Sequence, residues 1–249
     1  MLITASHDSA GLNRSLSMGG AVIVMAWQST GALRRRWQYT AMATGVLLTS
    51  TLGWVWAAPG AGASAPWLRR TTTLLVTSFM MSALGRFGLR RVLARGSDWI
   101  EAGRRAAPAF AATAGGLLVL VAIQEAWLFD ARRGVPMTPT TIGVVVAIAL
   151  LLAAACLATA ASRRPDPLRL DLPGRTLYVY AAEAILAIGA LHLWLTMPWL
   201  FDLGLLGRYW MWIVMLVALG GVAAAHAFAR RGMPVLAEPL ANTAMWLPL

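Results

Sequence analysis

The chain has 249 residues, of which 59% are hydrophobic and 12% are charged, and its mean hydropathy is +0.65. So little polar surface excludes an ordinary water-soluble domain of this length. The formal net charge of +11 comes from arginine, because the chain has no lysine. These arginines lie between apolar runs and not in a recognisable nucleic-acid module, so no nucleic acid is expected as a partner.

Seven apolar segments follow one another, each close to the ~20 residues that cross a bilayer core about 30 Å thick. They are residues 15–33, 39–57, 71–89, 107–129, 141–161, 177–201 and 205–228. Only residues 18–27 of the first segment are strongly apolar, and the third segment spans only if Arg86 reaches the interface. We therefore predict an all-α polytopic transmembrane helix bundle with six or seven spans, which forms a single unit over residues 1–249.

The arginines predict the orientation of the bundle, because cytoplasmic loops are enriched in basic residues. The richer set of alternate loops holds Arg34, Arg35, Arg36, Arg86, Arg90, Arg91, Arg95, Arg104, Arg105, Arg163, Arg164, Arg169, Arg175, Arg230 and Arg231. The poorer set holds Arg14, Arg69, Arg70, Arg132, Arg133 and Arg208. We therefore expect a multi-pass protein of a bacterial inner membrane with its N-terminus outside, anchored there by an uncleaved first segment.

Eight tryptophans fall near the proposed outer ends of the spans. They are Trp54, Trp56, Trp67, Trp127, Trp194, Trp199, Trp210 and Trp212. Indole rings prefer the level of the lipid headgroups, so this distribution predicts an outer aromatic belt. An aromatic wall that faces a substrate is the alternative.

Residues 86–106 form the longest cytoplasmic feature. Apolar and basic residues interleave there as they do in an amphipathic helix at a membrane surface, so we expect contact with anionic lipid at the cytoplasmic face. Asp98 and Glu101 resemble a capping box that opens a short helix. A structural role is favoured over a binding role.

Three further features concern the later part of the chain. Pro198 is the only proline placed to kink a strong span. Cys156 is the single cysteine, which excludes an intrachain disulfide and favours a packing role. Residues 233–240 are apolar again before the chain stops at Leu249, a pattern that we interpret as a piece of a longer protein.

Ionisable groups deep in a membrane are costly and mark functional sites. The candidate buried polar residues are Glu183, His192, His226 and Glu125, with Gln124 and Arg208 as further polar groups at depth. Glu183 is the strongest candidate, since it lies ~9 Å inside the cytoplasmic boundary with Tyr178 and Tyr180 on the same turns. Glu125 lies only ~6 Å from the outer boundary and is interpreted as a hydrated interfacial carboxylate.

Pairing among these residues is restricted by depth and by helix periodicity. His192 and His226 differ in depth by ~19 Å, so one haem iron cannot bind both. Nine residues separate Glu183 from His192 and place them on opposite helix faces. Glu183 and His226 differ by ~7 Å and can pair if their helices pack face to face, as a packing contact more than as a proton relay.

Common catalytic motifs are absent from the sequence. It holds no GxxxxGK[ST] phosphate loop, no HExxH helix, no CxxC and no GxSxG elbow. We expect no cofactor, no metal and no catalytic residue, and a role other than that of an enzyme.

Four stretches resemble segments of large multi-pass bacterial membrane proteins to which no activity is assigned. They are residues 174–183 (GRTLYVYAAE), 191–199 (LHLWLTMPW), 97–105 (SDWIEAGRR) and 124–130 (QEAWLFD). The resemblance covers about two thirds of the chain. It implies a longer parent protein and neither a substrate nor a catalytic residue.

The sequence therefore favours a structural or assembly module of a larger membrane protein, with the lipid bilayer and other membrane subunits as partners. The first alternative is a small-molecule or ion transporter that uses Glu183, His192 and His226 along a polar path. The second is a membrane enzyme that acts on lipid through residues 86–105. The absence of an acid, base and nucleophile constellation there weighs against the second alternative.

Overall fold

The computed structural model describes residues 66–88, 98–130, 134–162, 166, 170–199 and 204–246. The predicted segments 15–33 and 39–57, with Trp54 and Trp56, lie outside these residues. The part that is described is all-helical, without a strand. It divides into two compact units, Met1–Gln124 and Glu125–Leu249.

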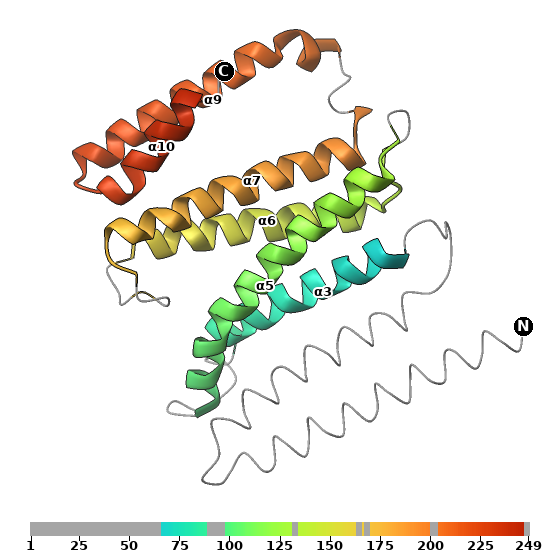
Figure 1. The fold of residues 1–249 in the computed structure, drawn as a ribbon, viewed down its shortest axis with the longest axis horizontal. Coiled ribbons are helices and arrows are strands. Elements are labelled where there is room, and N and C mark those ends of the chain that lie inside the picture. The colour runs from blue at the N-terminus through green and yellow to red at the C-terminus, as the bar shows by residue number, and fades with distance from the viewer. Residues whose placement is uncertain are drawn as a thin grey trace, which may run out of the picture. The chain divides into compact units, whose positions relative to one another are not determined.

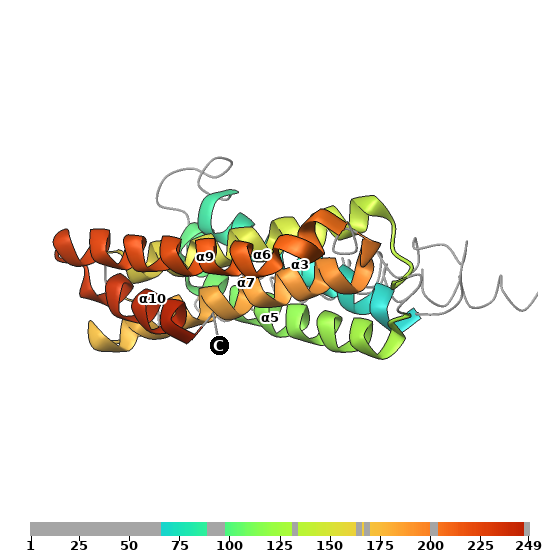
Figure 2. The same ribbon diagram turned by 90° about the horizontal axis from the view of Figure 1, so that it is seen from above.

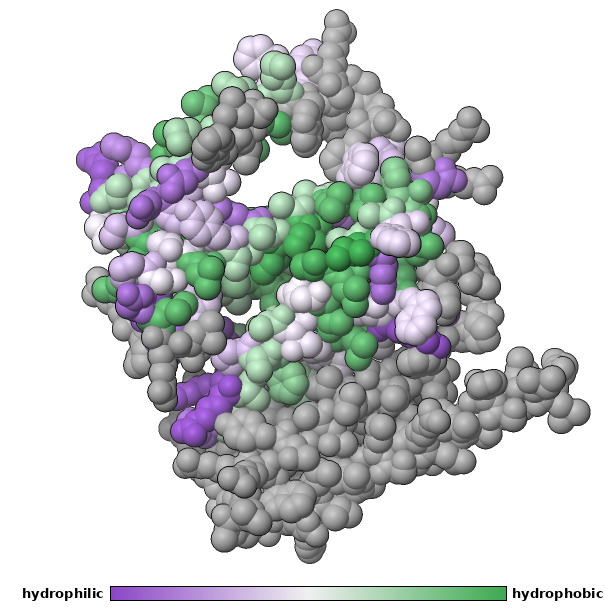
Figure 3. All heavy atoms as spheres, viewed as in Figure 1, coloured by the Kyte–Doolittle hydropathy of each residue, from purple (hydrophilic) through white to green (hydrophobic). Residues whose placement is uncertain are grey.

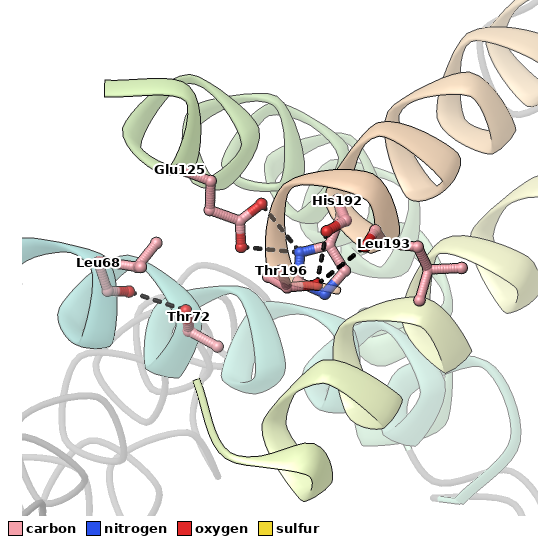
Figure 4. Close-up of polar contacts among 6 residues, drawn as sticks. All are labelled: Leu68, Thr72, Glu125, His192, Leu193 and Thr196. Atoms are coloured by element: carbon pink, nitrogen blue, oxygen red, sulfur yellow. Dashed lines mark hydrogen bonds and ion pairs between the residues drawn. The ribbon is translucent and has the colours of Figure 1, made fainter. Parts of the chain in front are cut away.

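The first unit contains the helix α3 (Pro66–Ala83), the π-helical turn η1 (Leu84–Gly88) and all but the last turn of the helix α5 (Asp98–Leu128). Four threonines lie inside α3. Their hydroxyls donate to the carbonyl four residues earlier, as in the bond from Thr72 to Leu68 at 2.8 Å (Figure 4). These bonds satisfy the hydroxyls without a partner from another helix.

A close backbone approach joins η1 to α5 within the first unit. A Cβ added to Gly85 would clash with the carbonyl oxygen of Gly103, so only glycine fits at position 85. One turn further along α5, the hydroxyl of Ser82 donates to the carbonyl of Ala107 at 2.9 Å. Small residues thus allow this chain reversal to pack tightly.

The second unit contains the helix α6 (Pro139–Ala160), the 3-10 turn η2 (Pro173–Arg175) and the helices α7 (Thr176–Thr196), α9 (Gly204–Arg230) and α10 (Pro234–Trp246). The helices α6 and α7 lie side by side, and α10 packs against both α9 and α7 (Figures 1 and 2). Ala160, Val179 and Leu236 form a small buried core where α6, α7 and α10 meet. In Figure 3 hydrophobic residues gather along α6 and α7, and hydrophilic residues gather towards helix ends.

Local sequence explains where these helices begin and end. Thr138 caps α6, since its hydroxyl accepts from the backbone N–H of Thr141 at 3.3 Å, and Pro139 follows at the first helical position. The helix α9 ends in a Schellman motif, in which Met233 N–H donates to Phe228 at 3.0 Å. Gly232 has a φ of 67° there, a left-handed conformation that favours glycine.

Four helical segments are long and apolar enough to cross a membrane: Trp99–Leu128, Pro139–Ala160, Pro173–Thr196 and Met211–Arg230. They correspond to the last four predicted spans. The third predicted span, residues 71–89, is helical in α3 and η1 but is not among the four. The hydropathy of α3 is low because this helix contains Arg69, Arg70 and four threonines.

Two local predictions are wrong. The helix that begins at Asp98 is not short, because α5 continues without a break to Leu128 and includes Pro108. At 1.5 Å per residue its 31 residues extend ~46 Å, more than the bilayer core requires. Pro198 does not kink a span either, since α7 ends at Thr196, two residues before this proline.

The predicted amphipathic segment 86–106 is divided between η1, residues outside the described part, and the first turns of α5. Glu101 binds Arg105 at 2.7 Å and Arg104 at 3.5 Å within α5. These contacts join residues three and four apart on one exposed helix face. Glu101 therefore supports the helix through these pairs.

The tryptophans near predicted outer ends are exposed wherever their side chains are described. They are Trp67, Trp127, Trp194, Trp199 and Trp212. Exposure on an otherwise apolar helix agrees with rings that face lipid headgroups.

Candidate functional site

The chain segment that follows α5 is fastened to the end of α7. Gly134 N–H donates to Asp130 at 2.7 Å, and Val135 N–H donates to the carbonyl of Leu195 at 2.9 Å. Gly134 has a φ of 66°, and a Cβ on it would lie 2.8 Å from the ring of Pro198. Glycine at 134 therefore allows the loop to close against α7.

An aromatic contact joins the same two parts of the chain. The rings of Phe129 and Trp194 stack with centroids 5.1 Å apart and an interplanar angle of 28°. Offset aromatic pairs of this kind add stabilisation beyond the area that they bury. The last turn of α5 is thus held against the last two turns of α7.

The consequence of this docking is a buried contact between Glu125 of α5 and His192 of α7. The two carboxylate oxygens lie 2.7 and 2.9 Å from Nδ1 of His192, and both side chains are 0% exposed. Figure 4 shows the carboxylate of Glu125 directed at the imidazole from the neighbouring helix. The two oxygens share one ring nitrogen, which fixes the orientation of the imidazole.

The backbone around His192 is also satisfied. Thr196 donates its hydroxyl to the carbonyl of His192 at 2.7 Å, one turn before α7 ends. The side chain of Thr196 thus folds back onto its own helix, as threonine hydroxyls do towards the carbonyl four residues earlier. It holds the turn that carries the imidazole.

The burial of Glu125 corrects the sequence interpretation of this residue. It is not a hydrated interfacial carboxylate, since its side chain is wholly enclosed and bound to histidine. The depth estimate alone indicated interfacial hydration, because it measures distance along one helix and does not include side chains that a neighbouring helix contributes. The partner that encloses Glu125 comes from 67 residues later in the chain.

The other ring nitrogen of His192 differs from Nδ1. Nε2 is buried and has no hydrogen-bond partner among the described residues. Buried polar atoms are nearly always hydrogen-bonded, and an isolated one costs about 1–3 kcal/mol. The pair therefore presents one polar atom that the helix contact itself does not use.

Glu183 lies at a separate polar contact between α7 and α10. Its Oε2 accepts from the hydroxyl of Thr243 at 2.6 Å, whereas Oε1 is buried and has no partner among the described residues. One residue earlier on α10, Asn242 donates to the hydroxyl of Tyr180 at 3.4 Å. Neither α10 residue was identified from the sequence, because 233–249 was analysed only as an apolar end.

His226 is exposed on α9, and its predicted contact with Glu183 is absent, since Glu183 binds Thr243 instead. His192 and Glu183 face different partners, Glu125 and Thr243, as the nine-residue spacing predicted. Gln124 is partly buried, with an unpartnered Oε1. The side chain of Arg208 lies outside what the structure describes.

Within the described ranges, no group of three or more histidine, cysteine, aspartate or glutamate side chains is arranged to hold a metal ion. Among the side chains that the structure describes, Glu125 and His192 are the ionisable pair in which both members are fully buried. Because both lie in helices of spanning character, it is the strongest candidate site.

A signal for this pair was present in the sequence. Glu125 and His192 lie ~6 Å and ~13 Å from the outer ends of their predicted spans, so their depths differ by about one and a half helix turns. Comparisons of the chain with protein-family models, curated proteins and solved structures find no match.

Proposed function

We propose that this protein is an integral protein of a bacterial inner membrane that serves as a structural or assembly module of a larger membrane protein. The observation that supports this role is the outer face of α9. In its span only 11% of the residues are buried within the chain, against 33% in α6. A helix with so few buried residues leaves most of its side chains available for contact with a further subunit.

The residue pattern of α9 divides it into two faces. Ala218, Gly221 and Ala225 face α10, since the first and last are buried and a Cβ on Gly221 would lie 3.0 Å from Ala244. Trp212, Leu216 and Leu219 are exposed. At 100° per residue, these three lie on the side of α9 opposite to the contact with α10. We assign this outer stripe to a neighbouring membrane subunit.

The experiment compares the size of the complex that carries the full-length protein after extraction in a mild detergent. Replacing Leu216 and Leu219 with alanine should shift the protein from a defined larger complex to a smaller species. The matched control replaces Leu150 and Leu151 of α6, which are 54% exposed, with alanine and removes the same apolar volume. An equal effect of both double variants, or a wild-type protein that runs alone, would contradict the assembly role.

A second candidate function is transport of an ion or a small molecule, and the Glu125–His192 pair supports it. Buried acid and histidine side chains in membrane helices are typical of ion and proton paths. A variant with Glu125→Leu and His192→Phe keeps apolar volume in place of the pair. If the pair moves a substrate, this variant should fold and reach the membrane but lose flux in reconstituted vesicles. Retained flux would exclude the pair from transport.

Enzymatic action on lipid is the least supported of the three roles. Within the described part of residues 86–105, the exposed charged side chains of α5 are engaged in the pairs of Glu101 with Arg104 and Arg105. These pairs stabilise a helix surface and supply no nucleophile. Incubation of the reconstituted protein with labelled phospholipid should therefore give no product.

A further inference from the structure

The two nitrogens of His192 stand in different environments. Nδ1 faces both oxygens of Glu125 at 2.7 and 2.9 Å, and Nε2 is buried without a hydrogen-bond partner among the described residues. A contact whose only purpose was to join two helices would gain nothing from this second nitrogen. The isolated atom instead lowers the stability that the contact provides.

The proton content of the pair follows from its surroundings. An uncompensated charge is costly in a site of low polarity, so the pair rests without net charge. A carboxylate and an imidazole are neutral together when they hold two protons. One proton lies between Glu125 and Nδ1, where the short distances place it, and the other must then be on Nε2.

Other titratable groups near the pair are few within residues 125–249. On α6, which packs against α7, the thiol of Cys156 is the only one. On α7 itself, Glu183 lies nine residues from His192 and binds Thr243 of α10. Asp130 follows Glu125 by five residues, and Tyr178 and Tyr180 lie on α7 before Glu183. Glu125 and His192 are the two ionisable side chains in direct contact here.

We propose that Glu125 and His192 form a proton-binding site that exchanges its proton with water through Nε2 of His192. Release breaks the Nε2–H bond and leaves the nitrogen lone pair behind, and the proton passes to a water molecule. The hydrogen bond between Glu125 and Nδ1 stays intact, so the helices remain joined while the proton leaves. This inference deepens the second candidate function, because it identifies the proton as the ion.

The test uses nitrogen NMR of the full-length protein in lipid nanodiscs, with labelled histidine. The chain has three histidines, so the signals of His192 are assigned by their loss in His192→Asn. We expect a proton on Nε2 that exchanges in deuterated water while backbone amides of α6 and α7 stay protected. No proton on Nε2, or a proton that exchanges only together with those amides, would overturn the proposal.

A variant gives an independent measurement. Glu125→Gln removes the carboxylate that balances the second proton of the pair, so His192 should carry a single proton in this variant. Glu183→Gln is the matched control, since Glu183 binds Thr243 and should leave the His192 signals unchanged. A second proton that remains on His192 in Glu125→Gln would contradict the proposal. If this variant does not fold, exchange in the wild-type protein still decides the question.

The readout separates this proposal from the transport function on which it rests. Proton exchange at Nε2 without flux in vesicles would support the site and reject transport. Flux in vesicles without proton exchange at Nε2 would support transport and would show that the proton does not bind at this site.

Discussion

At the scale of single residues, the Glu125–His192 contact places two ionisable side chains in a fully buried site, where each is the partner of the other. Hydrogen bonds between membrane helices contribute about 0.6 kcal/mol on average, because unpaired helices find other partners in the membrane. Removal of one member of a fully buried pair has a larger effect, since it leaves the other member enclosed without a partner. A single substitution should therefore destabilise the protein strongly, and the double substitution should destabilise it less than the two single losses added together.

We therefore expect Glu125→Leu or His192→Phe alone to lower the free energy of unfolding by about 3 kcal/mol. The double variant should lose clearly less than the sum of the two, because no polar group then remains buried without a partner. Reversible unfolding in mixed detergent micelles measures all three variants. Additive losses would show that the two side chains do not depend on each other.

At the scale of helices, α6 and α7 form the closest pair in the second unit because small residues meet where they cross. A Cβ on Gly189 of α7 would lie 3.2 Å from the Cβ of Ala149 on α6, and Ala149 is buried. Helices in membranes associate closely where small residues allow the backbones to approach. This approach also fixes the position of the α7 turn that carries His192, three residues after Gly189.

Gly189→Leu should therefore force α6 and α7 apart and destabilise the protein by about 1–3 kcal/mol, as overpacking does elsewhere. The control is Gly143→Leu on α6, where an added Cβ meets nothing within 4 Å. The measurement is the melting temperature of each variant after extraction in detergent. Equal melting temperatures would mean that the contact at Gly189 adapts to the larger side chain.

At the scale of the whole molecule, the arginines and tryptophans predict which ends of the spans face the cytoplasm. The segment between α6 and α7 contains Arg163, Arg164 and Arg169, whereas the segment between α5 and α6 contains Arg132 and Arg133. The exposed tryptophans near the second segment, Trp127 and Trp194, agree with an outer interface. Both signals predict that residues 134–138 lie outside.

This orientation predicts labelling by a membrane-impermeant thiol reagent in intact cells. In a Cys156→Ala background, Pro136→Cys should react from outside, and Leu172→Cys should react only after the membrane is opened. Both positions are exposed, so access to the side chain itself is similar. The reverse pattern would invert the orientation, and labelling of both positions in intact cells would contradict a span between them.

Much of the helical architecture followed from the sequence because a bilayer imposes a simple length requirement. Runs of about twenty apolar residues located α6, α7, α9 and most of α5. The predicted positions of helix ends were less accurate, because helix ends depend on local hydrogen bonds. The end of α7 before Pro198 shows this, since a window of hydropathy does not detect it. The capping pattern of Asp98 and Glu101 did indicate a helix start at Asp98, and only the length of that helix was wrong.

For the candidate site, the sequence likewise identified the residues but not their partners. The sequence identified Glu125, Glu183, His192 and His226 by residue type and depth, because ionisable groups stand out in apolar segments. Their partners depend on which helix faces meet, and one sequence does not contain that information. The structure joined Glu125 to His192 and Glu183 to Thr243, and left His226 exposed.

The sequence by itself determined that the described chain is helical and carries segments able to span a membrane, because hydropathy and length act along the chain. Only the tertiary structure decided that a carboxylate near the end of one helix is fully buried. The attachment of Val135 to Leu195 and the stacking of Phe129 on Trp194 bring that carboxylate against an imidazole. Burial of an ionisable group is a property of contacts between distant segments, and these contacts arise only when the helices pack.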